Sequence, residues 1–204
     1  MTLIPPIKRK DYPELDKKFF EPYEKLHGYV PNSNLVIARK PKILEAFRNL
    51  NSAIFAEDNT VKPGLLALVG NIASQAAGCT YCVAHTSNNA EIFGVSAQKI
   101  AALWDFERNK LFSAAERAAL RFAQSAASVP NMVSDHEIKC VVKYFGEEGV
   151  VEILAVVSYY GFLNRWNDSL ATELEKKAFL RATQTLRDTP WKAGKHKPKA
   201  TTDY

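Results

Sequence analysis

Two cysteines and a histidine follow one another at intervals of three residues, as Cys79, Cys82 and His85. On a helix, positions i and i+3 are neighbours, so each of the three side chains would lie beside the next. A thiolate can attack the oxygen of a hydroperoxide, which leaves a sulfenic acid that a second thiol converts into a disulfide. The spacing therefore predicts a two-thiol redox site with a histidine beside it.

The residues alone leave open which thiol attacks. Gly78 predicts the end of one helix, so Cys79 would lie at the N-terminus of the next, where the helix dipole favours a thiolate. His85 lies closer to Cys82 around the helix and could accept its proton. The helix end thus favours Cys79, and the histidine favours Cys82.

The cysteine pair has three other interpretations. Half of a zinc site is disfavoured because the chain has three cysteines and no second pair. A thioredoxin-type site would require a strand before Gly78, and none is predicted. Two buried cysteines with no redox role remain an alternative, because free cysteine packs well in cores.

The apolar periodicity is helical nearly throughout, and no segment shows the alternation of a strand with hairpin turns. The fold class is therefore all-α, as one helical domain over residues 1–187 with a possible half-repeat boundary near 108–112. Ser113 and Glu116 form a capping box at one helix start. The predicted helices span about 13–27, 32–39, 41–56, 63–77, 79–93, 96–106, 113–128, 134–145, 149–172 and 173–187.

The composition fits a globular protein, with 47% hydrophobic and 24% charged residues. Much of the net charge of +5 comes from the region after residue 175. We expect residues 188–204 to form a basic, mobile tail, with Trp191 and His196 as candidate anchors on a neighbouring protomer. Nucleic-acid binding is not expected, because the rest of the chain is nearly neutral.

No apolar run approaches the roughly 20 residues that span a bilayer, and Pro5 and Pro6 lie where a signal peptide would be apolar. We therefore expect a cytoplasmic protein without membrane association. No glycine motif for a nucleotide or flavin occurs, so no cofactor is expected.

The segment Gly78-Cys79-Thr80-Tyr81-Cys82-Val83-Ala84-His85-Thr86 resembles the alkylhydroperoxidase D-like, or carboxymuconolactone decarboxylase-like, superfamily. The resemblance is strongest to its peroxidase-related branch and extends to Asn164-Arg165-Trp166-Asn167-Asp168. It implies an alkylhydroperoxidase D-like helical fold, a homo-oligomer, and a thiol-dependent peroxidase that reduces hydrogen peroxide or organic hydroperoxides. In this family pattern Cys82 attacks the hydroperoxide, Cys79 resolves it, His85 assists, and a dithiol or disulfide-reductase partner supplies electrons.

The chain departs from the family pattern at the proton relay. The family has a glutamate where this sequence has Ala67, and its relay histidine falls at Thr86. No acidic residue occurs between Asp58 and Glu91. The side chains that could assist instead are Asn71, Gln75, Thr86 or Glu91.

Two alternative functions follow from the same residues. One is a carboxymuconolactone decarboxylase-type enzyme, which would need acid and base groups rather than a dithiol. The other is a non-catalytic redox sensor, in which a disulfide changes helix packing or oligomeric state. The intact cysteine pair favours the peroxidase over the decarboxylase.

Overall fold

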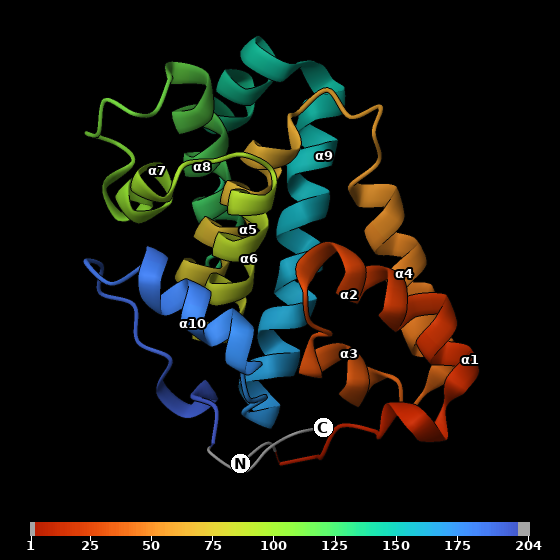
Figure 1. The fold of residues 1–204 in the computed structure, drawn as a ribbon. Helices are drawn as coiled ribbons and strands as arrows, with labels where there is room; N and C mark the ends of the chain where they lie inside the picture. The colour runs from red at the N-terminus through yellow and green to blue at the C-terminus, as the bar shows by residue number, and fades with distance from the viewer. Residues whose placement is uncertain (1–2, 200–204) are drawn as a thin grey trace.

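The computed structural model describes residues 3–199 and is helical throughout, with no strand in that range. The all-α prediction is confirmed. Figure 1 shows the arrangement of the helices. They are η1 (Arg9–Asp11), α1 (Pro13–Leu15), η2 (Asp16–Phe20), α2 (Glu21–His27), α3 (Asn32–Ile37), α4 (Pro41–Ile54), α5 (Pro63–Ala76), α6 (Thr80–Ile92), α7 (Ala97–Ala101), η3 (Ala102–Asp105), α8 (Ala114–Ala127), α9 (Asp135–Leu170), α10 (Lys176–Thr185) and η4 (Gly194–His196).

The hairpin of α5 and α6 lies at the centre of the molecule and packs against α8, α9 and α10 (Figure 1). Pro63 occupies the first turn of α5, where its missing N–H costs nothing. Gly78 has φ of +74°, a left-handed conformation that suits glycine and turns the chain from α5 into α6. This turn sets the N-terminus of α6, and with it the position of both cysteines.

Helix α9 runs alongside α5 so closely that one α5 position must be glycine. A Cβ built on Gly70 would lie 2.3 Å from Cε2 of Tyr160 on α9. The close approach brings the second half of α9 against α6. The end of α9 therefore reaches the cysteine motif.

Helix capping explains the start of the second half of the chain. Ser113 accepts a hydrogen bond from the Glu116 N–H in a capping box at α8, as predicted, and Ser134 does the same with Glu137 at α9. The predicted helices 134–145 and 149–172 are the two parts of α9, and they meet at Gly146, where φ is +69° and ψ is −178°.

The connection from α9 to α10 differs from the predicted helix over 173–187. Ala171 takes a left-handed conformation with φ of +48°, and α10 begins only at Lys176. Thr172 and Leu174 are buried in this connection rather than arranged on a helix face. As a consequence, Glu175 precedes α10 and turns toward α6.

The part of the expected tail that the structure describes packs against the rest of the chain. Trp191 donates a hydrogen bond from Nε1 to the Thr80 carbonyl at 3.0 Å, and Thr80 Oγ1 donates to the Ala193 carbonyl at 3.2 Å. The Leu174 N–H donates to the His196 carbonyl at 2.8 Å. Buried apolar and backbone contacts thus hold residues 191–196 against the chain itself; residues 200–204 lie outside the described range.

None of the helices over residues 3–199 is long and apolar enough to cross a membrane.

Candidate functional site

Both cysteines of the motif lie at the start of α6 and carry free thiols. Cys79 is the N-cap residue, and Cys82 lies in the first turn. Both are buried, and their thiols are hydrogen-bonded to each other. The i, i+3 spacing therefore brings the two sulfurs together as predicted.

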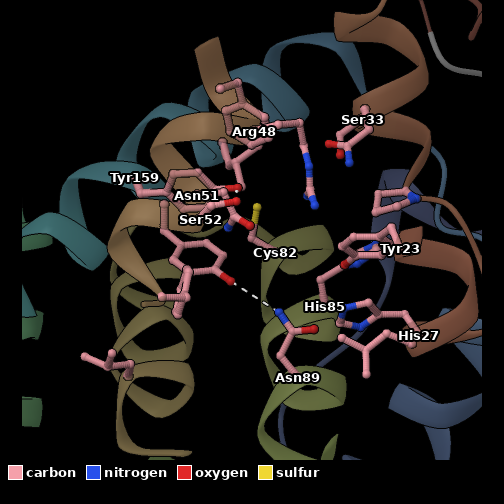
Figure 2. A pocket seen from close by; sticks show the side chains of 18 of the residues that line it. Tyr23, His27, Ser33, Arg48, Asn51, Ser52, Cys82, His85, Asn89 and Tyr159 are labelled. Carbon is pink, nitrogen blue, oxygen red and sulfur yellow. Dashed lines mark hydrogen bonds between the residues drawn. The ribbon is translucent and has the colours of Figure 1, made fainter. Parts of the chain in front are cut away.

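A cavity of about 610 Å³ opens over Cys82 but not over Cys79. Figure 2 shows the Cys82 sulfur pointing into this space, with Asn51 and Arg48 above it and His85 on the neighbouring turn of α6. The walls come from α2, α4, α6 and α9 and are rich in aromatic rings. The aromatic lining consists of Tyr23, Phe47, Phe55, Tyr81, Phe93, Tyr159 and Tyr160.

The two thiols differ in acidity. The hydrogen bond from Cys82 lowers the pKa of Cys79, although burial acts against this. Burial raises the pKa of Cys82 well above its usual value, and the neighbouring Cys79 raises it further. Asn167 on α9 opposes this rise by donating from Nδ2 to Cys82 Sγ at 3.5 Å. Acidity thus favours Cys79 as the first thiolate, whereas access to the cavity favours Cys82.

His85 lines the cavity, but both of its ring nitrogens point to partners other than Cys82. Nε2 lies 2.9 Å from Oε2 of Glu175, and Nδ1 lies 3.4 Å from the hydroxyl of Tyr29. Both side chains of the His85–Glu175 pair are about 9% exposed. Tyr81 stacks on the imidazole with ring centroids 4.5 Å apart. The histidine is therefore held in place before any substrate binds.

Glu175 is in turn held by two further donors. Its Oε1 accepts from the Tyr81 hydroxyl at 2.9 Å and from the Asn32 N–H at 2.5 Å. This carboxylate comes from the connection before α10, which the left-handed Ala171 shapes. The sequence prediction missed it because residue 175 was assigned to a helix.

Two further side chains give the cavity its polarity. The guanidinium of Arg48 lies over the Tyr23 ring at 5.2 Å, and among the described residues it forms no ion pair. The His27 ring stacks on the same Tyr23 ring, with the two ring centroids 3.9 Å apart. Burial, followed by the nearby His85, lowers the pKa of His27 to about 4. At neutral pH, Arg48 therefore carries a positive charge into the cavity while His27 is neutral.

Comparison with known proteins agrees with the helical architecture. A model of the Carboxymuconolactone decarboxylase family matches residues 41–125, from α4 into α8. The crystal structure of the debrominase Bmp8 C82A in complex with 2,3,4-tribromopyrrole superposes with a TM-score of 0.83 and 31% identity. That superposition covers 91% of this chain and 98% of Bmp8. The chain belongs to the alkylhydroperoxidase D-like, carboxymuconolactone decarboxylase-like superfamily.

Other similar proteins share less sequence identity with this chain. An uncharacterized peroxidase-related protein from Ralstonia eutropha JMP134, described as an alkylhydroperoxidase AhpD core, superposes with a TM-score of 0.79 at 20% identity. That match covers 88% of this chain and 95% of the other. The uncharacterized protein YnjA of Escherichia coli K12 is 28% identical over 108 residues, 53% of this chain and 59% of YnjA. The chain thus matches only about three fifths of YnjA's length.

The alkylhydroperoxidase D-like proton relay needs a carboxylate, and here Ala67 takes the position where the sequence pattern expects it. None of the four predicted substitutes pairs with His85. Asn71 and Gln75 bond to each other, and Asn71 also donates to Thr86, while Glu91 accepts from Thr185. The carboxylate that pairs with the histidine is Glu175.

A second polar cluster lies behind Cys79, away from the cavity. A carboxylate oxygen of Asp168, a ring nitrogen of His196 and Cys79 Sγ all lie within 4.8 Å of one another. The Lys195 ammonium lies 2.8 Å from Asp168 Oδ2. Within the described residues, this cluster is the second place where a histidine approaches a cysteine of the motif.

Proposed function

We propose that this protein is a dithiol-dependent oxidoreductase whose principal acceptor is an organic hydroperoxide. The observation that carries the proposal is the asymmetry of the pair: the Cys82 sulfur faces a cavity, and Cys79 lies hydrogen-bonded behind it. One thiol can therefore meet a substrate while the other waits within reach. The apolar and aromatic lining suits an organic hydroperoxide better than hydrogen peroxide.

The reaction proceeds in two steps. Cys82 loses its proton as its sulfur attacks the terminal oxygen of the hydroperoxide, so the O–O bond breaks, Cys82 becomes a sulfenic acid, and the departing alkoxide takes up a proton and leaves as an alcohol. Cys79 then attacks the Cys82 sulfur, the S–O bond breaks, and water leaves as the disulfide forms. An external dithiol restores both thiols, so each turnover consumes one hydroperoxide and one dithiol.

His85 serves the first step as the acid for the departing alkoxide. It lines the cavity beside Cys82, and Glu175 and Tyr29 hold its two ring nitrogens. A histidine fixed by a carboxylate can donate a proton and recover it without reorienting. The pair thus supplies the acid–base function for which the family pattern uses a glutamate at the position of Ala67.

Reductive dehalogenation of an aromatic ring is a second candidate, favoured by the likeness to the debrominase Bmp8 and by the aromatic cavity. In such a reaction the ring exchanges a halogen for a proton, a hydrogen halide leaves, and the two thiols become a disulfide. The electron balance is the same as for the peroxidase. Only the acceptor differs.

The two acceptors can be separated in one experiment on the full-length reduced protein. It would be mixed with a dithiol and either an organic hydroperoxide or a halogenated pyrrole, while peroxide loss, halide release and protein thiols are measured. We expect peroxide loss with two thiols consumed per first turnover, and Cys82→Ser should abolish it. Cys140→Ser is the matched control, because Cys140 lies on α9 beside His136.

Halide release without peroxide turnover would replace the hydroperoxide with a halogenated ring as the acceptor. Loss of two thiols that stops after one equivalent, whichever dithiol is supplied, would indicate a redox sensor. Activity that survives Cys82→Ser would contradict thiol chemistry altogether.

A further inference from the structure

The C-terminal segment delivers a buried histidine to the resolving cysteine. His196 is 1% exposed, and its Nδ1 lies 2.7 Å from the Thr172 carbonyl oxygen. A carbonyl can only accept, so Nδ1 carries the proton and Nε2 of the neutral ring has a free lone pair. Nε2 has no hydrogen-bond partner among the described residues and lies 3.5 Å from Asp168 Oδ1, on the side of Cys79.

We propose that His196 is the proton acceptor of Cys79 in disulfide formation, with Asp168 stabilising the imidazolium that results. The proposal rests on the two-thiol chemistry given above but not on the identity of the acceptor. In the step, Nε2 takes the Cys79 proton as its sulfur attacks Cys82. The S–S bond forms, the S–O bond of the sulfenic acid breaks, and the proton passes to the departing hydroxide to give water.

His85 is not placed for this role, because it lines the cavity over Cys82, which Cys79 does not line. The two histidines therefore divide the work by location. His85 serves the cavity at Cys82, and His196 serves the polar cluster behind Cys79.

The groups around His196 suit a base that is neutral at rest and charged for a moment. Burial lowers the pKa of His196, while the Thr172 carbonyl and Asp168 oppose this shift. The other titratable side chains facing the ring are Cys79, Lys195 and, edge-on at 5.7 Å between ring centroids, Tyr81. Lys195 balances the charge of Asp168, so the cluster carries its own cation.

The segment is held by bonds that do not involve the His196 side chain. These are the contacts of Trp191 and Ala193 with Thr80 and the backbone bond from Leu174 to His196. In a His196→Asn variant, we therefore expect the C-terminal segment to keep its position against the rest of the chain. The asparagine side-chain amide can replace Nδ1 as the donor to Thr172 but cannot accept the thiol proton.

The test uses an aromatic disulfide as the oxidant of the fully reduced, full-length protein. Cys82 attacks it and releases one aromatic thiol, and Cys79 then closes the disulfide and releases the second, so that absorbance follows each step. In His196→Asn we expect the first phase to keep its rate and the second to slow by about 100-fold, a typical contribution of a general base. The exposed His136→Asn is the matched control.

The pH dependence adds a readout that a merely structural role would not change. In the wild type, the second phase should level off above the lowered pKa of His196. In His196→Asn it should keep rising with the thiolate fraction of Cys79. Asp168→Asn should slow the second phase less than His196→Asn and shift the plateau to lower pH, because the imidazolium loses its carboxylate.

A second phase that is unchanged in His196→Asn would overturn the proposal, and so would equal slowing of both phases. Disappearance of the wild-type plateau on adding a chelator would assign the cluster to a metal ion instead. Absence of hydroperoxide turnover would refute the proposed function and leave this measurement valid, because an aromatic disulfide drives it.

Discussion

The two cysteines lie three residues apart, yet they face different regions of the molecule. Cys82 faces a cavity walled by aromatic rings, with the charge of Arg48 and the His85–Glu175 pair nearby. Cys79 faces a polar cluster of Asp168, His196 and Lys195, in which only the histidine is buried. The first region offers a cavity for a substrate, and the second offers groups that can exchange a proton with Cys79. On the proposed function, one helical turn therefore separates the attacking cysteine from the resolving one.

Removing Cys79 is the strongest way to test this division. In Cys79→Ser, Cys82 should still react once with a hydroperoxide, but turnover with a dithiol should fall by about 1,000-fold or more, as expected when an essential group is lost. Mass spectrometry after trapping with a sulfenic-acid reagent should find the adduct on Cys82. An adduct on Cys79 in the wild type would reverse the two roles, in line with its lower pKa.

Glu175→Gln should produce the next largest effect, confined to the cavity side. The amide oxygen can still accept from Asn32 and Tyr81, but the charge opposite His85 Nε2 is lost. We expect the rate of Cys82 oxidation to fall by about 100-fold, with the second phase of the aromatic-disulfide reaction unchanged. Glu147→Gln, at an exposed position outside the cavity, is the control and should have the wild-type rate.

The sequence predicts the parts of this site that depend on neighbouring residues, and it does not predict contacts between residues far apart in the chain. Capping boxes, Pro63 and Gly78 are local signals, so the helices and the neighbouring thiols could be predicted. Glu175 reaches His85 only through the left-handed Ala171, and an alanine carries no signal for that conformation. That connection depends on tertiary packing, which helix periodicity does not encode.

The C-terminal segment also makes contacts that its sequence does not predict. The sequence marks Trp191 and His196 as candidate anchors, because an aromatic residue in a polar stretch suggests docking. The surface on which they dock belongs to the same chain, at Thr80 and Thr172, and not to a neighbouring protomer. Composition predicted an anchor but carried no information about its partner.

The two regions should also differ in how they respond to acid. Burial lowers the pKa of His27, on the cavity side, from 6.5 to about 4. Below pH 6.5 this histidine takes up a proton when the protein unfolds, because the buried ring stays neutral until the pH approaches 4. The free energy of unfolding therefore has its full value above pH 6.5 and decreases as the pH falls toward 4. The loss is at most about 3 kcal/mol in the free energy of unfolding.

Denaturant titrations between pH 7 and 4 would measure this effect. His27→Phe keeps a ring on Tyr23 and should flatten the pH dependence, leaving a smaller slope from His196, whose pKa is also lowered by burial. His136→Gln, at an exposed position, should follow the wild-type curve. If the free energy of unfolding depends on pH equally in His27→Phe and in the wild type, burial does not lower the pKa of His27.

Arg48 should give the smallest and most selective effect, because it acts on binding rather than on the thiols. Its charge is unpaired among the described residues and faces the cavity, so it should favour acceptors that carry a carboxylate. In Arg48→Gln we expect kcat/KM to fall by about 10-fold for a carboxylate-bearing hydroperoxide and to hold for a neutral one, while Arg48→Lys should recover part of the loss. Equal losses for both acceptors would mean that Arg48 shapes the cavity instead, and the Cys82 side would then select by fit and not by charge.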